Sequence, residues 1–165
     1  MAYGTSDPRI GAQPIANTET AAQHPLGTVI RANDPTYGDG EFIYLLGVAS
    51  TVVGSVVTYD ASTYQTVLSA VGGSIPRAVA ISMSANVATQ YGWYQISGQA
   101  VIAKSCLVSL AAGAAVGVLT TGFIAGTGSG KEIQGAVVAA VASAAAGRTT
   151  VKVMIARPTK QGRIT

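Results

Sequence analysis

Short runs of alternating apolar and polar residues follow one another along most of the chain, and glycine or polar turns separate them. Residues 77–83 (RAVAISM) alternate small and large apolar side chains, as a strand between two packed layers does, and residues 91–97 (YGWYQIS) are rich in aromatics. The same reasoning predicts further strands over 26–31, 41–48, 52–59, 64–68, 99–103, 106–110, 116–120, 135–142 and 149–156. Many short strands at this spacing are typical of an all-β sandwich or barrel.

Glycines punctuate this pattern and leave one element open. Gly54 is expected to mark a bulge, and Gly98 a bend that joins two strands as a hairpin or corner. Residues 126–130 are expected to form a loop. The Ala-rich stretch 136–146 also fits a short helix, which competes with the strand predicted there.

The two ends of the chain differ from the middle. Residues 1–25 lack periodicity and contain three prolines, which a helix or a central strand does not tolerate. We therefore expect an extended N-terminal arm over 1–25 that orders against a partner, a β domain over 26–157 and a basic C-terminal tail over 158–165. Residues 1–41 carry a net charge of −3 and residues 148–165 a net charge of +5. These ends either pair between neighbouring copies or are simply solvated.

Charged residues are too few to support much chemistry. They make up 10% of the chain, and only five lie between residues 42 and 147. The single histidine, His24, precedes Pro25 in the arm, where nothing holds it beside a nucleophile. The single cysteine, Cys106, excludes an internal disulfide and a multi-cysteine zinc site, and its apolar neighbours indicate a buried thiol in a reducing compartment. The sequence predicts no enzyme, no catalytic residue, no cofactor and no metal.

Three further patterns imitate binding motifs. Residues 126–132 (GTGSGKE) imitate a phosphate-binding loop, but Ala125 replaces its first glycine and Glu132 its Ser/Thr. Two charge-free spans do not fit a membrane helix: 42–59 holds two Gly and several Ser/Thr among β-branched residues, and 105–130 is dominated by Ala, Gly and Thr. No secretory signal precedes them. The basic residues near the C-terminus alternate with apolar ones as in a strand, without the aromatics of a nucleic-acid surface. We expect neither a membrane nor a nucleic acid as partner.

The aromatic group at residues 91–94 is the remaining candidate binding feature. Because alternate residues of a strand face opposite ways, Tyr91 and Trp93 are expected on one face and Tyr94 on the other. Core packing and an interface explain such residues better than a ligand platform. A carbohydrate- or ligand-binding domain that uses them is retained as an alternative.

Several segments resemble the capsid decoration (cement, head-stabilising) proteins of tailed bacteriophages. They are 47–60 (GVASTVVGSVVTYD), 76–82 (PRAVAIS), 90–101 (QYGWYQISGQAV), 110–119 (LAAGAAVGVL), 135–138 (GAVV) and 150–153 (TVKV). The resemblance covers roughly residues 26–157 and rests on small-residue patterns. It implies a compact β-barrel or β-tulip-like domain, with a two-sheet sandwich or jelly roll as the alternative.

The resemblance also implies a role and partners. Such a protein is made in the host cytoplasm and sits on the exterior of the virion, commonly as a homotrimer, where it clamps neighbouring major capsid subunits and stabilises the icosahedral head. No small-molecule substrate is expected. Another virion part, such as a head-fibre base or a tail or baseplate component, is the alternative. From the arm, the aromatic group and the basic end we select these interface candidates: Arg9, Ile10, Pro14, Ile15, Arg31, Tyr91, Trp93, Tyr94, Lys152 and Arg157.

Overall fold

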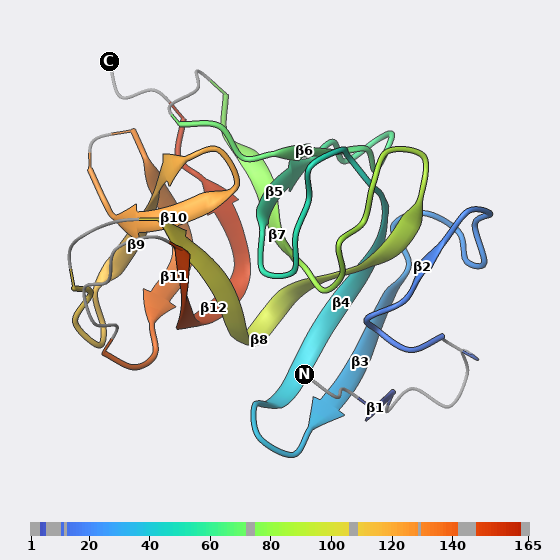
Figure 1. The fold of residues 1–165 in the computed structure, drawn as a ribbon, viewed down its shortest axis with the longest axis horizontal. Helices are drawn as coiled ribbons and strands as arrows, with labels where there is room; N and C mark the ends of the chain where they lie inside the picture. The colour runs from blue at the N-terminus through green and yellow to red at the C-terminus, as the bar shows by residue number, and fades with distance from the viewer. Residues whose placement is uncertain are drawn as a thin grey trace.

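The fold is built from strands alone (Figure 1). The structure, a computed structural model, describes residues 4–5, 11, 13–71, 75–105, 109–128, 130–141 and 148–162. Within these ranges there is no helix, and therefore none that could span a membrane. The all-β prediction is confirmed. The strands are β1 (Gly4–Thr5), β2 (Thr18–Glu19), β3 (Val29–Asp34), β4 (Gly38–Leu46), β5 (Val56–Tyr59), β6 (Thr66–Leu68), β7 (Arg77–Ser82), β8 (Tyr91–Ser105), β9 (Ala115–Thr120), β10 (Phe123–Gly126), β11 (Glu132–Val138) and β12 (Arg148–Lys160).

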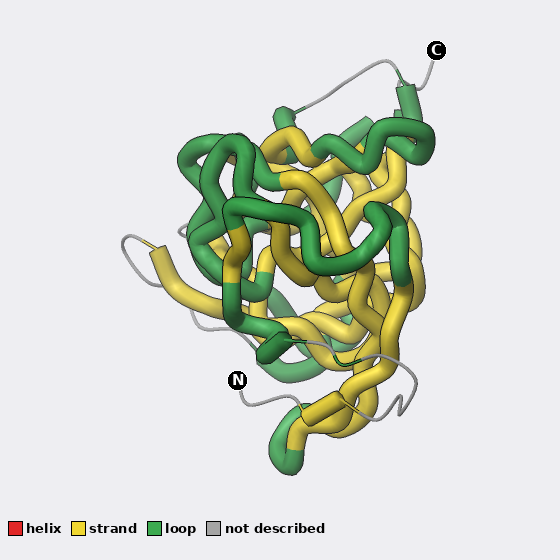
Figure 2. Tube along the Cα trace, turned by 90° about the vertical axis from the view of Figure 1, so that its right-hand side faces the viewer, coloured by secondary structure: helices red, strands yellow, loops and turns green. Residues whose placement is uncertain are grey.

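Hydrogen bonds join these strands into one sheet. Its order is β1-β3-β4-β8-β10-β9-β11-β12-β7-β5-β6, with β2 on β8 and with further pairings of β8 to β12 and to β7. The pairings are antiparallel except that of β10 with β8. The sheet is not closed into a barrel, so the prediction of a barrel is wrong. The extra pairings of β8 fold the sheet back on itself, which is compatible with the sandwich or jelly-roll alternative (Figures 1 and 2).

Strand β8 connects the two halves of the molecule. Its first half pairs with β4, and its second half pairs with β12 in an unbroken register from Ser97–Ala156 to Ser105–Arg148. Gly98 lies at the junction with φ +100°. The strands predicted on either side of Gly98 are therefore one long strand, because β12 pairs with the residues after the bend, with Gly98 and with Ser97, while β4 pairs with Ser97 and the residues before it.

Three clusters of buried side chains form the core. The largest lies among β5, β7 and the second half of β8 with β9–β12. The other two lie on opposite faces of β4 and the first half of β8. Trp93 belongs to one of them with Tyr91 packed against it, and Tyr94 belongs to the other, so the alternation predicted for these aromatics is confirmed.

The described part of the N-terminal arm is docked on the sheet. Ile15 is 3% exposed and packs in the same cluster as Phe42, Tyr44 and Trp93. β2 pairs with the start of β8. The His24 ring packs against Tyr44 in a T-shaped contact with a centroid distance of 5.3 Å. Residues 13–25 therefore act as a strap over one face of the sheet.

The C-terminal boundary differs from the one predicted. β12 continues through Pro158, which is buried, to Lys160, so the first residues of the predicted tail belong to the sheet. At this end β12 pairs with β7 instead of β8. The Lys160 ammonium donates a hydrogen bond of 2.6 Å to the Ala70 carbonyl, and burial lowers the pKa of Lys160. The strand predicted over 135–142 ends at Val138, without a helix in the described part of 136–146.

Candidate interaction surfaces

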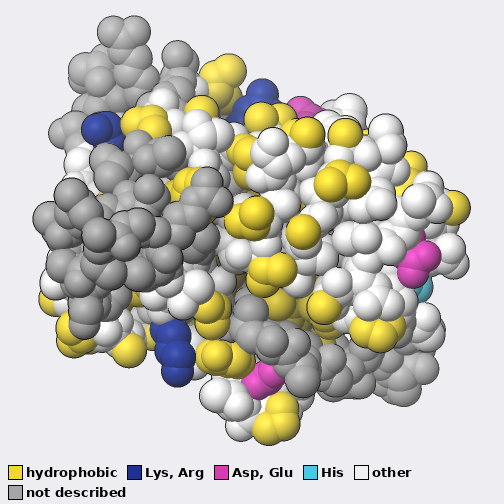
Figure 3. All heavy atoms as spheres, viewed as in Figure 1, with side chains coloured by type: hydrophobic (Ala, Val, Ile, Leu, Met, Phe, Trp, Pro, Cys, Tyr) yellow, Lys and Arg dark blue, Asp and Glu magenta, His cyan; other side chains and the backbone are white. Residues whose placement is uncertain are grey.

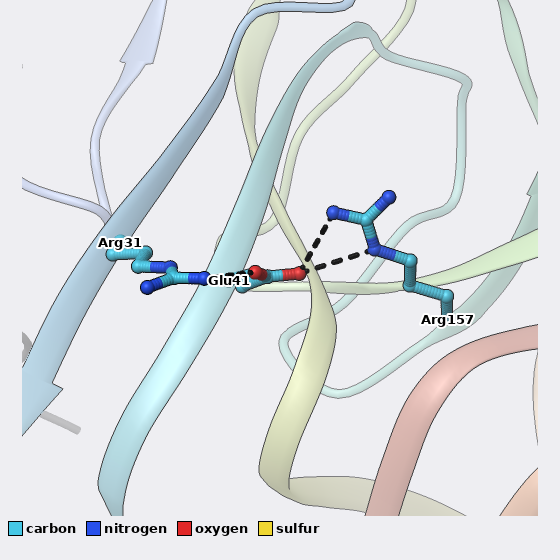
Figure 4. A network of polar contacts seen from close by, with 3 residues as sticks. All are labelled: Arg31, Glu41 and Arg157. Atoms are coloured by element: carbon cyan, nitrogen blue, oxygen red, sulfur yellow. Dashed lines mark hydrogen bonds and ion pairs between the residues drawn. The ribbon is translucent and has the colours of Figure 1, made fainter.

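One ion-pair network crosses the outer side of the sheet (Figure 4). Arg157 donates to Glu41 Oε2 from Nε at 3.2 Å and from Nη2 at 3.1 Å, and Arg31 donates to Glu41 Oε1 at 3.3 Å. The strand register explains the arrangement: Arg31 lies opposite Glu41, Glu41 opposite Ser97, and Ser97 opposite the residue before Arg157. The network thus joins β3, β4 and β12, which come from the two ends of the chain.

This network changes the interpretation of the charge gradient. Glu41 of the acidic head and Arg157 of the basic end are paired within one chain. The Glu41 side chain is only 19% exposed, whereas those of Arg31 and Arg157 are 77% and 70% exposed. Glu41 is therefore occupied by its own chain, and pairing between copies through this residue would require the internal pairs to open.

Replacing Glu41 by Gln is expected to destabilise the fold slightly, by roughly 0.5–1 kcal/mol, because ion pairs with exposed arginines are screened by solvent. The loss should shrink at high salt, since mobile ions weaken the pairs in the unmodified protein too. Urea unfolding of both proteins at low and at high sodium chloride measures this. A loss of several kcal/mol that is independent of salt would show that Glu41 acts by packing instead.

A second candidate surface comes from a part of the chain that carries almost no charge. Between residues 46 and 90 the only charged residues are Asp60 and Arg77, and their side chains lie 3.8 Å apart. Hydrogen bonds from the side chain and backbone of Ser62 and from the backbone of Thr63 lower the pKa of Asp60 to about 2. This part of the chain exposes six large aliphatic side chains, Val52, Val53, Val67, Val71, Ile75 and Val87. We call these six residues the aliphatic face.

Figure 3 shows the same distribution on the molecular surface. Hydrophobic side chains are spread over the region of β5, β6 and β7, and charged side chains lie towards the margin of the view. Single exposed aliphatic residues are ordinary, but an accumulation of them with no unpaired charge is typical of interaction sites. The aliphatic face is therefore the first candidate for contact with another protein.

A smaller apolar area lies on the other half of the molecule. Val137 on β11 and Met154 on β12 are cross-strand neighbours, 44% and 48% exposed. Beside them, the Lys152 ammonium lies 5.3 Å from the centroid of the Tyr37 ring. Lys152 and Tyr37 also line a shallow groove of about 300 Å³ together with Val101, Ala140, Val141, Thr150 and Val151.

The interface candidates chosen from the sequence fall into three groups. Arg31, Lys152 and Arg157 are exposed on the outer side of the sheet, and Pro14 is exposed on the strap. The structure brings Arg31 and Arg157 together on Glu41. Arg9 and Ile10 lie outside the described residues, as does Cys106. The buried or partly buried candidates are Ile15, Tyr91, Trp93 and Tyr94.

The buried candidates serve the core. Ile15, Trp93 and Tyr94 are at most 3% exposed, so they present no surface to a partner or a ligand. The Tyr94 hydroxyl accepts a hydrogen bond of 3.1 Å from the Asn86 amide, and burial raises the pKa of Tyr94. Tyr91 is half-buried and stacks on Tyr44 at a centroid distance of 6.2 Å. A ligand platform on this aromatic group is not formed.

The surface that the candidates missed is the aliphatic face. Its signal was present in the sequence as the scarcity of charge after residue 42, but an alternating apolar pattern does not reveal which face of a strand remains open.

Two sequence features that were considered for chemistry make only local contacts in the described part of the chain. His24 Nε2 is 2.9 Å from Gln13 Oε1, a contact within the strap. In the sequence that imitates a phosphate-binding loop, the Lys131 amide donates to the Gly128 carbonyl, between β10 and β11. In the part of the chain that the structure describes, no group of three or more His, Cys, Asp or Glu side chains is placed to hold a metal ion.

Comparison with known proteins gave no match: neither a protein-family model, nor a curated protein, nor a solved structure matches this chain. Its function must therefore be inferred from the chain itself and from the surfaces described above.

Proposed function

We propose that this chain is a virion structural protein that decorates the exterior of an icosahedral phage head and stabilises it by clamping neighbouring major capsid subunits. The observation that carries the proposal is the aliphatic face, where six exposed large side chains accompany a single, internally paired set of charges. The residue pattern over 26–157 supports a decoration protein in particular, since it resembles that family. In finer terms, we propose a layered sandwich or jelly-roll arrangement of the sheet.

The physical basis of such a role is the burial of apolar surface. Each square ångström of apolar surface removed from water contributes roughly 25 cal/mol, without requirements on direction. The binding free energy from one such contact is modest. Linked copies bind a repeating shell more tightly, because the first bound copy raises the effective concentration of the others at their sites. A homotrimer on the head, the assembly that the resemblance implies, would gain affinity in this way.

Co-sedimentation tests the proposal. The purified protein is mixed with assembled, expanded shells of the phage that encodes it and, separately, with dispersed major capsid subunits. We expect the protein to pellet with the shells and to bind the dispersed subunits much more weakly, because a clamp needs two neighbouring subunits in place. Equal binding to dispersed subunits, or no binding to shells, would refute the proposal.

A further inference from the structure

We infer that the outer side of the sheet around Glu41 is a docking surface of its own, where Arg31 and Arg157 bind carboxylates on an acidic segment of the major capsid protein. The partner is named on the basis of the proposed function, whereas the carboxylate chemistry follows from the surface itself.

The strand register places a row of side chains on one side of the sheet. Arg31 is paired with Glu41, and Glu41 with Ser97. Ser97 is paired in turn with Ala156, the residue before Arg157. Residues directly opposite each other on neighbouring strands share a face. Figure 4 shows the result: the Arg31 and Arg157 side chains approach the Glu41 carboxylate from opposite sides.

The same side of the sheet continues along β12 to a pair of exposed apolar side chains. Because side chains alternate along a strand, Met154 points to the same side as Ala156. Val137 on β11 lies opposite Met154, and the two residues are 44% and 48% exposed. The surface therefore presents guanidinium groups together with apolar side chains.

Both guanidinium groups keep donors for a further carboxylate. Arg31 donates to Glu41 through Nη2 only, and Arg157 donates through Nε and Nη2. Their side chains are 77% and 70% exposed, so the remaining N–H groups face solvent, whereas Glu41 is 19% exposed. A guanidinium group presents its donors as a planar fork that matches a carboxylate. A hollow of about 530 Å³, lined by Arg31 and Glu41 among others, leaves room for a partner side chain.

Arg157 is held in this place by an unusual backbone conformation. Its φ of +43° is rare for a residue other than glycine. The residue lies in a bulge, because residues 156–158 of β12 are opposite Gly135 alone on β11. Bulges redirect side chains and are frequent at functional sites, where such strain is retained. Here the bulge directs Arg157 across β8 towards Glu41.

The neighbouring groups favour a protein over a nucleic acid as the partner. Asp39 lines the same hollow, where it accepts a hydrogen bond of 2.9 Å from the Asn33 amide. A row of phosphates would come close to Asp39 and Glu41, whereas a single carboxylate can contact one guanidinium group and avoid both. Met154 and Val137 offer nothing to a phosphate but can pack against apolar side chains of a protein.

Co-sedimentation with expanded shells tests the surface through Arg31→Gln and Arg157→Gln. Each is expected to weaken shell binding roughly fivefold, the effect of one exposed ion pair. Arg77→Gln is the matched control, because Arg77 is also an exposed arginine, 46%, with an internal acidic partner, Asp60, at 3.8 Å. It should bind as the unmodified protein does. Glu41→Gln should bind at least as tightly, since it removes the internal competitor, whereas a purely structural role predicts weaker binding.

A second measurement needs no substitution in the protein that binds. The isotope-labelled, unmodified protein is titrated with a capped glutamate-rich peptide and followed by the arginine Nε–H signals in NMR spectra. The signals of Arg31 and Arg157, assigned by their loss in the two Gln variants, should shift, and that of Arg77 should not. The same peptide with glutamine in place of glutamate should have no effect, and oligothymidine a smaller one.

The inference would be overturned by equal shifts of all three arginines, by no shift, or by larger shifts with oligothymidine. Thermal unfolding by circular dichroism verifies that each variant is folded. Shells bound equally well by the unmodified protein and by both arginine variants would refute only this inference. A protein that binds the peptide through Arg31 and Arg157 but does not bind shells would refute the proposed function and leave the carboxylate site in place.

Discussion

Gly98→Ala is expected to lower the free energy of unfolding by about 3 kcal/mol or more, from backbone strain together with overpacking. Gly98 has φ +100°, which L-residues with a side chain rarely adopt. A Cβ atom there would overlap the Asp39 carbonyl oxygen and lie 3.1 Å from the Gly40 Cα atom. Both are backbone atoms of β4, so relief would require moving β4 away from β8 at the junction of the two halves.

Gly113→Ala is the matched control for this prediction. Gly113 also has positive φ, +78°, but a Cβ atom there would meet no other atom within 4 Å. Its replacement should lower the free energy of unfolding by roughly 1 kcal/mol, from the strain of the backbone conformation alone. Urea unfolding followed by the fluorescence of Trp93, the single tryptophan, measures both variants. Equal losses for the two glycines would contradict the close approach of β4 to β8.

Ile15→Asp is expected to release the strap from the sheet. Ile15 is 3% exposed beside Phe42, Tyr44 and Trp93, and a carboxylate cannot be buried there without a partner. Deleting a buried isoleucine side chain alone lowers the free energy of unfolding by about 2–5 kcal/mol. The strand β2 has only two residues, so its hydrogen bonds to β8 are too few to hold the strap in place. Trp93 is fully buried, so the loss of its cover should shift its emission to longer wavelength and increase its quenching by acrylamide.

Ala16→Asp provides the control for the strap, because Ala16 is exposed and adjacent. This variant should keep the emission maximum and the quenching of the unmodified protein. If Ile15→Asp behaves in the same way, the strap does not cover Trp93 in solution.

The local fold was predictable where the alternation was strong. The strand expected over 77–83 is found as β7 (Arg77–Ser82), and the opposite sides of Trp93 and Tyr94 follow directly from the period of a strand. β10 was missed because its four residues, FIAG, are too few to alternate, and only the last of them, Gly126, lay in a predicted element, the loop over 126–130. Closure of the sheet was not predictable, because it depends on which distant strands pair, and one sequence does not show this.

Two predicted strand ends, at Gly98 and before Pro158, were wrong for the same reason. Each residue predicts a break when only its own segment is considered, but both lie within long strands. In the structure, β12 pairs across the Gly98 junction and then changes partner from β8 to β7 beyond Ala156, so pairing with other strands overrides the local signal. Arg157, at this change of partner, has φ +43° and directs its side chain towards Glu41.

The candidate surfaces were only partly predictable for the same reason. Arg31 and Arg157 were selected by charge, but their meeting on Glu41 required the register of β3, β4, β8 and β12. Trp93 and Tyr94 were selected as aromatics, and the strap and β5–β7 cover them. The aliphatic face consists of valines and an isoleucine that resemble core residues until the layers are assembled.

A cryo-electron microscopy map of expanded shells incubated with this protein tests the central claim most directly. The same shells without the protein provide the reference. The proposed function predicts additional density on the outer surface of the shell, with each unit contacting more than one major capsid subunit. A map without additional density on the shell, or density confined to the tail or to a head fibre, would contradict it.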